Sequence, residues 1–207
     1  MTSEAALLEH GPLGVQLERA RSLGFLGPGP VGDQIRHTGA FLRALRDASG
    51  TVLDLGSGGG VPGLVIAVAR PDLRLVLLDA TARRCRFLED AVAALGLAAQ
   101  VIEGRAEVVG RGRLRGTVDA VVARSFGAPA TTAECAAPLL RVDGLLVVSE
   151  PPAPEPERWP AEALARLGLV ADPPSGTTPR IQVLHQGTVC PLDFPRRDGV
   201  PAKRRLF

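Results

Sequence analysis

Short runs of β-branched and leucine residues alternate along the chain with longer stretches in which apolar residues recur every three or four positions. The first pattern is typical of buried strands, and the second of helices with one buried face. Alternation of the two predicts an α/β fold, with a mostly parallel sheet covered by helices on both faces. The expected strands are 52–55, 73–78, 99–103, 118–123, 145–149 and 181–184, and the expected helices are 62–69, 82–95 and 129–140.

The two ends of the chain differ from this alternating part. Before Thr51, only 35–45 shows a helical pattern, and it follows a turn-forming Gly-Pro-Gly-Pro sequence at 27–30. The chain has enough apolar residues for one sizeable hydrophobic core but not for two, so we expect one domain with additions at its ends. The expected divisions are a short helical cap (1–48), an α/β domain (49–193) and a basic C-terminal tail (194–207).

Composition narrows the class of protein. Hydrophobic residues make up 45% of the 207 residues, enough for a globular core, but no apolar run approaches the roughly 20 residues that span a bilayer. The first residues include Glu4 and Glu9 instead of a basic segment that leads into an apolar one. The three Cys and three His are scattered without metal-ligand spacing. We expect a soluble cytoplasmic monomer without a metal and without a membrane partner.

Positive charge is concentrated at the C-terminus. The formal net charge is only +2, but the last fourteen residues carry five cations against Asp198 alone. A patch of this kind attracts acidic partners such as nucleic acid, although a solvated basic end is the simpler alternative. The candidate phosphate contacts are Arg196, Arg197, Lys203, Arg204 and Arg205.

A strand that runs into a glycine-rich turn is the strongest chemical signal. Residues 51–63 read TVLDLGSGGGVPG, and glycines in such a turn adopt positive φ and let a ligand approach the backbone closely. The second expected strand is followed by Asp79, 19 residues after Gly60. In doubly wound folds an acidic side chain at about this spacing meets ribose hydroxyls. The sequence therefore predicts a ligand that contains a nucleoside.

Two ligands compete for this turn. Gly58, Gly60 and Gly63 fit the G-x-G-x-x-G spacing of dinucleotide sites, so an NAD(P)-binding oxidoreductase must be considered. Pro62, however, removes a backbone N–H from the helix start that would bind a pyrophosphate. S-adenosyl-L-methionine (SAM) has a ribose and an adenine but no phosphate. We favour SAM, with NAD(P) and a purely structural turn as alternatives.

The residues after the fourth expected strand limit the kinds of atom that could accept the methyl group. Residues 123–127 read ARSFG, without the Asp/Asn-Pro-Pro-aromatic motif of enzymes that methylate exocyclic amines and without the nucleophilic Cys of cytosine-C5 enzymes. A target that needs neither a base nor covalent activation is favoured. Guanine N7 is such a target, because its lone pair attacks directly and no proton is removed. Catalysis would then consist of positioning and electrostatics.

Four segments of the chain together resemble the RsmG (GidB) family, the bacterial guanine-N7 methyltransferases of 16S ribosomal RNA. They are 54–63, 77–79 together with 83–88, 123–126 and 194–203. The resemblance implies a Rossmann-like class I SAM-dependent methyltransferase fold. It also implies SAM as cofactor and a guanine in the 530 loop of the small ribosomal subunit as target.

The resemblance also implies a set of site residues. Asp79 would hold the ribose, Glu107 would flank the adenine, and Arg124 would be the candidate catalytic residue at the crevice where the fourth strand ends. Because the turn and Asp79 lie outside the tail, removal of the tail is expected to leave SAM affinity unchanged. The candidate SAM contacts are Gly56, Ser57, Gly58, Gly60, Val61, Asp79, Ala106, Glu107 and Arg124.

Two segments depart from the family pattern. Residues 23–30 lack the Asn-Leu-Thr-like stretch of a longer N-terminal helical segment, and Glu150 stands where the family commonly has a Lys-Gly pair. Since phosphate binding relies on cations, an acidic residue near an RNA-facing edge weakens the inference of catalysis. The second hypothesis is therefore a SAM- and RNA-binding protein of the same fold with weakened catalysis.

Overall fold

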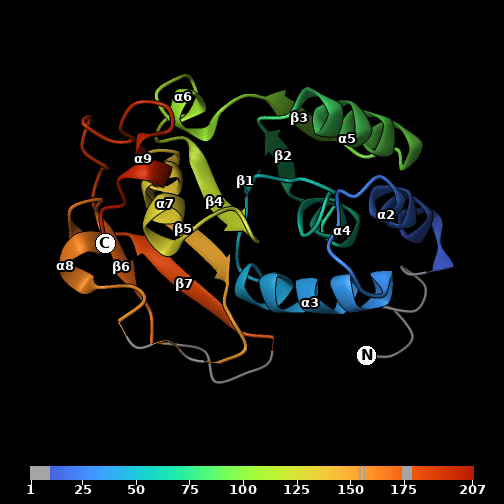
Figure 1. Cartoon of the computed structure of the whole chain (residues 1–207), viewed down its shortest axis with the longest axis horizontal. Helices are drawn as coiled ribbons and strands as arrows, with labels where there is room; N and C mark the ends of the chain where they lie inside the picture. Colours follow the sequence, from blue (N-terminus) through green and yellow to red (C-terminus); the bar gives the residue numbers. More distant parts are fainter. Residues whose placement is uncertain (1–9, 154, 156, 174–178) are drawn as a thin grey trace.

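Seven strands form one sheet in the computed structural model, which describes residues 10–153, 155, 157–173 and 179–207 (Figure 1). The order across the sheet is β3-β2-β1-β4-β5-β7-β6. The pairs from β3 to β5 are parallel, and β7 is antiparallel to both of its neighbours. The mostly parallel α/β sheet is thus confirmed. The strands are β1 (Thr51–Leu55), β2 (Arg74–Asp79), β3 (Ala99–Glu103), β4 (Val118–Ala123), β5 (Leu140–Ser149), β6 (Leu169–Ala171) and β7 (Ile181–Gln186).

Helices cover both faces of the sheet. In Figure 1, α2 to α5 lie to the right of and below the central strands, and α6 to α9 lie to the left. Within the described residues, no helix is long and apolar enough to cross a membrane. The helices are α2 (Pro12–Ser22), α3 (Val31–Ala44), α4 (Gly63–Ala69), α5 (Ala82–Ala94), α6 (Ala106–Val109), α7 (Pro129–Ala136), α8 (Ala161–Ala165) and α9 (Val200–Lys203).

Alternating side chains of the central strands pack into hydrophobic clusters on opposite faces of the sheet. Val52 of β1 packs with Phe41 of α3 and Ile66 of α4 on one face. Leu53 and its alternate neighbour Leu55 pack on the other face, with α7 and α8. Successive strand residues point to opposite faces, so a strand covered by helices on both sides is apolar throughout. This explains the largely apolar runs 52–55, 73–78 and 118–123 that predict β1, β2 and β4, each of which contains a single charged residue.

The register of the sheet positions the site. Leu55 at the end of β1 pairs with Leu78, and Asp79 at the end of β2 pairs with Glu103 of β3. The carboxyl ends of these parallel strands therefore lie at one edge. The turn after β1 is consequently beside Asp79, although the two are far apart in the sequence.

The N-terminal region contains more helix than the sequence pattern indicated. The prediction that only 35–45 is helical before Thr51 is wrong, since α2 forms and α3 begins at Val31. Leu13 and Leu17 of α2 are buried against α4 and α5. With few apolar positions in a polar segment, α2 is stabilised by packing on neighbours that a local pattern does not reveal. The short strand β6 escaped prediction for a similar reason.

The C-terminal residues are tied to α7. Glu134 of α7 is fully buried, and its carboxylate accepts hydrogen bonds from the backbone N–H of Arg196 at 2.8 Å and from its guanidinium at 2.8 and 2.6 Å. The Thr131 hydroxyl donates to the carbonyl of Pro201 at 3.0 Å. Arg115 donates to the carbonyl of Phe194 at 2.7 Å. The basic segment is therefore an anchored part of the fold.

Candidate functional site

The glycine turn joins β1 to α4 and is fastened to β2. The backbone N–H groups of Gly56 and Ser57 both donate to the carbonyl of Leu78 at 2.9 Å. Gly56, Gly58 and Gly60 have φ values of 76°, 55° and 87°. Residues other than glycine rarely adopt such φ values, which explains why glycines occupy these positions.

Asp54 stabilises the glycine turn through hydrogen bonds to residues within it. Its carboxylate is buried and accepts a hydrogen bond from the backbone N–H of Gly63, at the start of α4, at 3.0 Å. Burial raises the pKa of Asp54 to about 7. The buried Ser57 hydroxyl donates to the carbonyl of Asp54 at 3.0 Å. Both side chains serve the local structure, so Ser57 can offer a ligand little beyond its backbone.

Asp79 connects the turn to the end of β2. One carboxylate oxygen accepts from the N–H of Gly58 at 2.9 Å, and the other accepts from the N–H of Thr81 at 2.9 Å. The side chain is almost completely buried. Each carboxylate oxygen can accept a second hydrogen bond. Asp79 therefore has a fixed orientation and retains capacity for a ligand with hydroxyl donors.

A cavity of about 250 Å³ lies beside Asp79, at the carboxyl edge of β2, and is here named the Asp79 cavity. A second buried carboxylate, that of Glu107, also lines it and accepts from the N–H of Gly199 at 3.0 Å and from Arg105 at 3.3 Å. Phe126 forms a further, apolar wall. The predicted residues that line this cavity are Gly56, Asp79, Ala106 and Glu107.

The C-terminal segment belongs to this cavity as well. Ala202 of α9 lines it, and Gly199 holds Glu107 in place. Removal of the segment would open the wall and leave Glu107 with Arg105 as its remaining hydrogen-bond donor. This geometry argues against the expectation that removal of the tail leaves cofactor affinity unchanged, and the expectation stays untested. The sequence carried no local signal for this contact between the C-terminal segment and the cavity, because Glu107 and Gly199 are 92 positions apart.

A second cavity, of about 190 Å³, lies on the other side of the turn and is here named the Arg124 cavity. The Arg124 guanidinium donates to the Gln34 side chain through Nη2, whereas its Nη1 is buried and has no hydrogen-bond partner among the described residues. A buried donor without a partner is costly, so this nitrogen is suited to receive an acceptor from a ligand. The predicted residues that line this cavity are Gly56, Ser57, Gly58, Val61 and Arg124.

The N-terminal region contributes residues that the sequence did not single out. Gln34 of α3 holds Arg124, and Phe25 lines the Arg124 cavity. Gly60 shapes the turn, and a Cβ there would lie 2.3 Å from the Leu64 side chain. Only folding brings the cap over the turn, so spacing alone could not identify Gln34 or Phe25.

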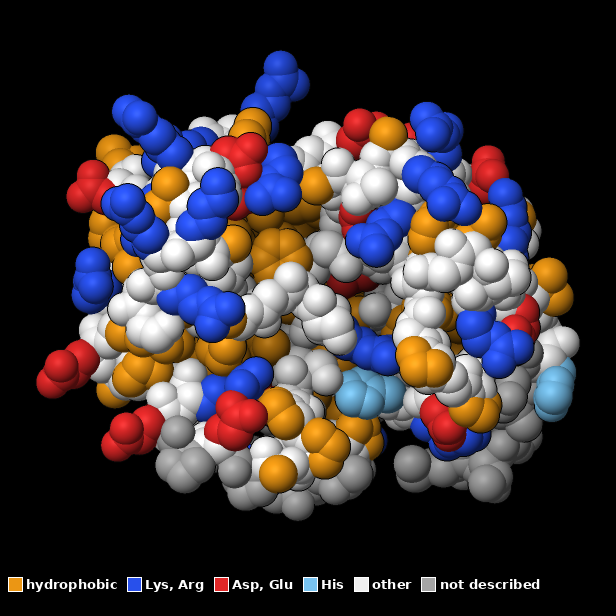
Figure 2. Space-filling view, viewed as in Figure 1, with side chains coloured by type: hydrophobic (Ala, Val, Ile, Leu, Met, Phe, Trp, Pro, Cys, Tyr) orange, Lys and Arg blue, Asp and Glu red, His pale blue; other side chains and the backbone are white. Residues whose placement is uncertain are grey.

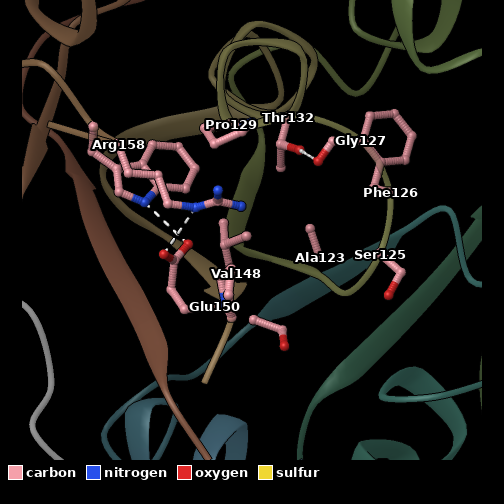
Figure 3. Close-up of a pocket in the computed structure, with 12 residues that line it drawn as sticks. Ala123, Ser125, Phe126, Gly127, Pro129, Thr132, Val148, Glu150 and Arg158 are labelled. Carbon is pink, nitrogen blue, oxygen red and sulfur yellow. Dashed lines mark hydrogen bonds and ion pairs between the residues drawn. The ribbon is translucent and has the colours of Figure 1, made fainter. Parts of the chain in front are cut away.

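A third cavity, of about 270 Å³, lies between the ends of β4 and β5 and is here named the β4–β5 cavity. In Figure 3, Phe126 lies on one side of it, and Glu150 and Arg158 lie on the other. Phe126 also lines the Asp79 cavity, and Ser125 also lines the Arg124 cavity. All three cavities thus meet at the residues that follow β4.

Cations surround this part of the surface. Figure 2 shows Lys and Arg side chains on both sides of a hollow near the centre of the view, with apolar atoms inside it. Arg197, Lys203 and Arg204 are exposed. Arg196, in contrast, is paired with Glu134, so its charge is compensated within the protein. This pairing gives Arg196 a structural role, while its contact with phosphate stays a prediction.

Comparisons with known proteins identify relatives of this chain. A family model described as rRNA small subunit methyltransferase G (GidB) matches residues 38–157. Ribosomal RNA small subunit methyltransferase G of Deinococcus radiodurans is 39% identical over 171 residues, covering 78% of this chain and 68% of that protein. The protein of the same name from Mycobacterium marinum is 41% identical over 151 residues, covering 70% of this chain and 65% of that protein. The aligned region thus spans about two thirds of these relatives.

Solved structures support the fold independently. A proposed O-methyltransferase from Klebsiella pneumoniae superposes with a TM-score of 0.61, covering 84% of this chain and 89% of that chain. Sequence identity is 16%, so this similarity concerns the fold alone. The architecture is that of class I methyltransferases, as the sequence predicted.

Proposed function

The chain belongs to the family of the rRNA small subunit methyltransferase G, and on this premise we propose that it transfers a methyl group from SAM to N7 of a guanine in 16S rRNA. The target is placed in the 530 loop of the small ribosomal subunit, as the family resemblance implies. One observation carries the proposal. The Asp79 cavity, with two buried carboxylates, and the Arg124 guanidinium nitrogen that has no partner in the described part of the chain lie on either side of one glycine turn.

The residues present fit SAM. The Asp79 carboxylate would accept from ribose hydroxyls, and Glu107 and Phe126 would flank the adenine in the same cavity. The buried Nη1 of Arg124 would pair with the carboxylate of the methionine portion. A dinucleotide fits less well, because Pro62 supplies no N–H at the helix start where a pyrophosphate would bind. This disfavours the oxidoreductase alternative.

The chemistry requires little from the protein beyond positioning. Bound SAM would supply an electrophilic methyl group to the N7 lone pair, with S-adenosylhomocysteine as the leaving group. Guanine N7 carries no proton, so no side chain has to act as a base. Asp79 and Arg124 bind the two ends of the cofactor, and the walls of the cavities exclude water. Arg124 is thus a catalytic residue in the sense that it contacts the cofactor.

The substrate RNA would approach over the basic rim of the hollow. Exposed cations of the C-terminal segment, namely Arg197, Lys203 and Arg204, are free to contact phosphates, unlike the paired Arg196. We propose 16S rRNA or the small ribosomal subunit as the partner, bound by a monomer of this chain.

Methyl transfer to small ribosomal subunits tests the proposed function. Subunits that lack the modification are incubated with the protein and tritiated SAM, and the product is mapped by mass spectrometry. The expected result is label on N7 of one guanine in 16S rRNA. Binding of SAM and RNA without transfer would support the hypothesis of weakened catalysis. Calorimetric binding of NAD(H) but not SAM would favour the oxidoreductase.

The conformation of the turn leads to a prediction for Gly58→Val. Gly58 has a φ of 55°, which a β-branched residue resists, and its N–H orients Asp79. We expect SAM affinity to fall at least about tenfold, with a modest loss of stability, since left-handed backbone costs about 1–2 kcal/mol per residue. Calorimetry and thermal unfolding measure the two effects. Wild-type SAM affinity in a folded variant would contradict the assigned role of the turn.

The rim cations lead to a prediction for the triple variant Arg197→Ala, Lys203→Ala, Arg204→Ala. Each phosphate contact contributes about 0.7–0.9 to the slope of log K against log salt, so the slope should flatten by about 2 to 3. Arg46→Ala is the matched control, since this exposed arginine precedes β1, at the opposite edge of the sheet. An unaltered slope in the triple variant would show that these cations do not contact phosphate.

A further inference from the structure

The β4–β5 cavity contains a carboxylate, that of Glu150, to which the proposed cofactor site assigns no role. Its volume of about 270 Å³ is slightly below the roughly 300–1,000 Å³ of pockets that enclose drug-sized ligands. This volume suits a single base better than a stretch of several nucleotides. Phe126 provides an aromatic face on one side, and Glu150 provides a carboxylate on the other (Figure 3). A flat group with hydrogen-bond donors on one edge would complement both.

Glu150 is held in a fixed position inside this cavity. Its side chain is only 10% exposed. One carboxylate oxygen accepts from the indole N–H of Trp159 at 3.1 Å, and the other lies 3.0 Å from Nε of Arg158. Arg158 is held in turn by Glu155. Since each carboxylate oxygen can accept a second hydrogen bond, Glu150 is oriented by the protein and still able to accept from a ligand.

The cavity adjoins both parts of the proposed SAM site. Phe126 separates it from the Asp79 cavity, and Ser125 is shared with the Arg124 cavity. A base in the β4–β5 cavity would therefore lie next to the cofactor. Enzymes that modify a base remove it from its stack and hold it between apolar or aromatic side chains, with hydrogen bonds to its Watson–Crick edge.

We propose that the β4–β5 cavity receives the target base and that Glu150 selects guanine by accepting hydrogen bonds from N1–H and the 2-amino group. Among the four bases, only guanine presents two adjacent donors on its Watson–Crick edge, whereas adenine would oppose the carboxylate with the lone pair of N1. Guanine N7 lies on a different edge and stays free to react. The inference rests on the proposed function and adds the residue that determines specificity.

The test compares Glu150→Gln with the wild-type protein on two 16S rRNA substrates. These carry guanine or inosine at the methylated nucleotide; inosine keeps N7 and N1–H but lacks the 2-amino group. For the wild type, kcat/KM should fall at least about tenfold with inosine, because a site built to hydrogen-bond a group rejects the analogue without it. Glu150→Gln should lower kcat/KM on guanine by about tenfold to a hundredfold and should respond little to the loss of the 2-amino group.

Controls separate recognition from folding. Glu155→Gln is the matched variant, since Glu155 pairs with the same Arg158 but does not line the cavity, and it should keep the wild-type preference for guanine. SAM affinity and melting temperature should be near wild type in both variants. If Glu150→Gln keeps the wild-type ratio between the two substrates, this inference is overturned while the proposed function stands. If the wild type methylates neither substrate, the proposed function fails, and the inference with it.

Discussion

Replacing Arg196 by alanine should destabilise the folded protein by about 3–5 kcal/mol, because the substitution leaves the fully buried carboxylate of Glu134 without its cation. The loss includes two guanidinium hydrogen bonds to Glu134 and one to the carbonyl of Arg204. Urea unfolding at neutral pH measures the effect. Arg197→Ala is the control, since this neighbour is exposed and should change stability by no more than about 0.5 kcal/mol.

A second substitution shows whether the buried charge is the cause. Glu134→Gln in the Arg196→Ala background removes the unpaired charge and should recover part of the lost stability. If Arg196→Ala unfolds with the wild-type midpoint, the pair does not anchor the segment. The anchored segment also predicts weaker SAM binding in Arg196→Ala, because Ala202 and Gly199 complete the Asp79 cavity.

Asp79→Ala should raise the Kd for SAM by one to two orders of magnitude, corresponding to about 1–3 kcal/mol. The substitution removes a charged acceptor from the ribose and leaves the N–H groups of Gly58 and Thr81 without their partner. Calorimetry on the folded variant measures the change. Asp72→Ala is a suitable control, since that exposed carboxylate pairs with Arg70 at the start of β2. Wild-type affinity in a folded Asp79→Ala protein would remove Asp79 from the site.

The functional interpretation of Glu150 depends on the residues that it contacts in the fold. In the sequence it is an acidic residue near an RNA-facing edge, which argued for weakened catalysis. In the structure it is paired with Arg158, eight positions later, and with the Trp159 indole N–H. The edge thus carries a cation close to the carboxylate. The acidic side chain therefore gives no reason to favour a protein without catalysis.

Features that depend on neighbouring residues could be predicted from the amino-acid sequence alone. Apolar runs identified β1 to β4, and the bounds of β3 and β4 match the prediction. The glycine turn and Asp79 followed from spacing, because a tight turn with positive φ demands glycine and parallel strands bring their carboxyl ends together. These signals are local, so they can be read without knowledge of the packing.

Contacts between groups that are far apart in the chain became visible in the folded structure. Arg196 and Glu134 are 62 positions apart, and Arg124 and Gln34 are 90 apart. The sequence could show that the C-terminus is basic, but whether a given cation faces solvent or a buried carboxylate depends on how the segment packs against α7. The same holds for α2, whose buried face exists only because α4 and α5 lie against it. Such choices are settled by burial and pairing across the fold, which leave no periodic pattern in the chain.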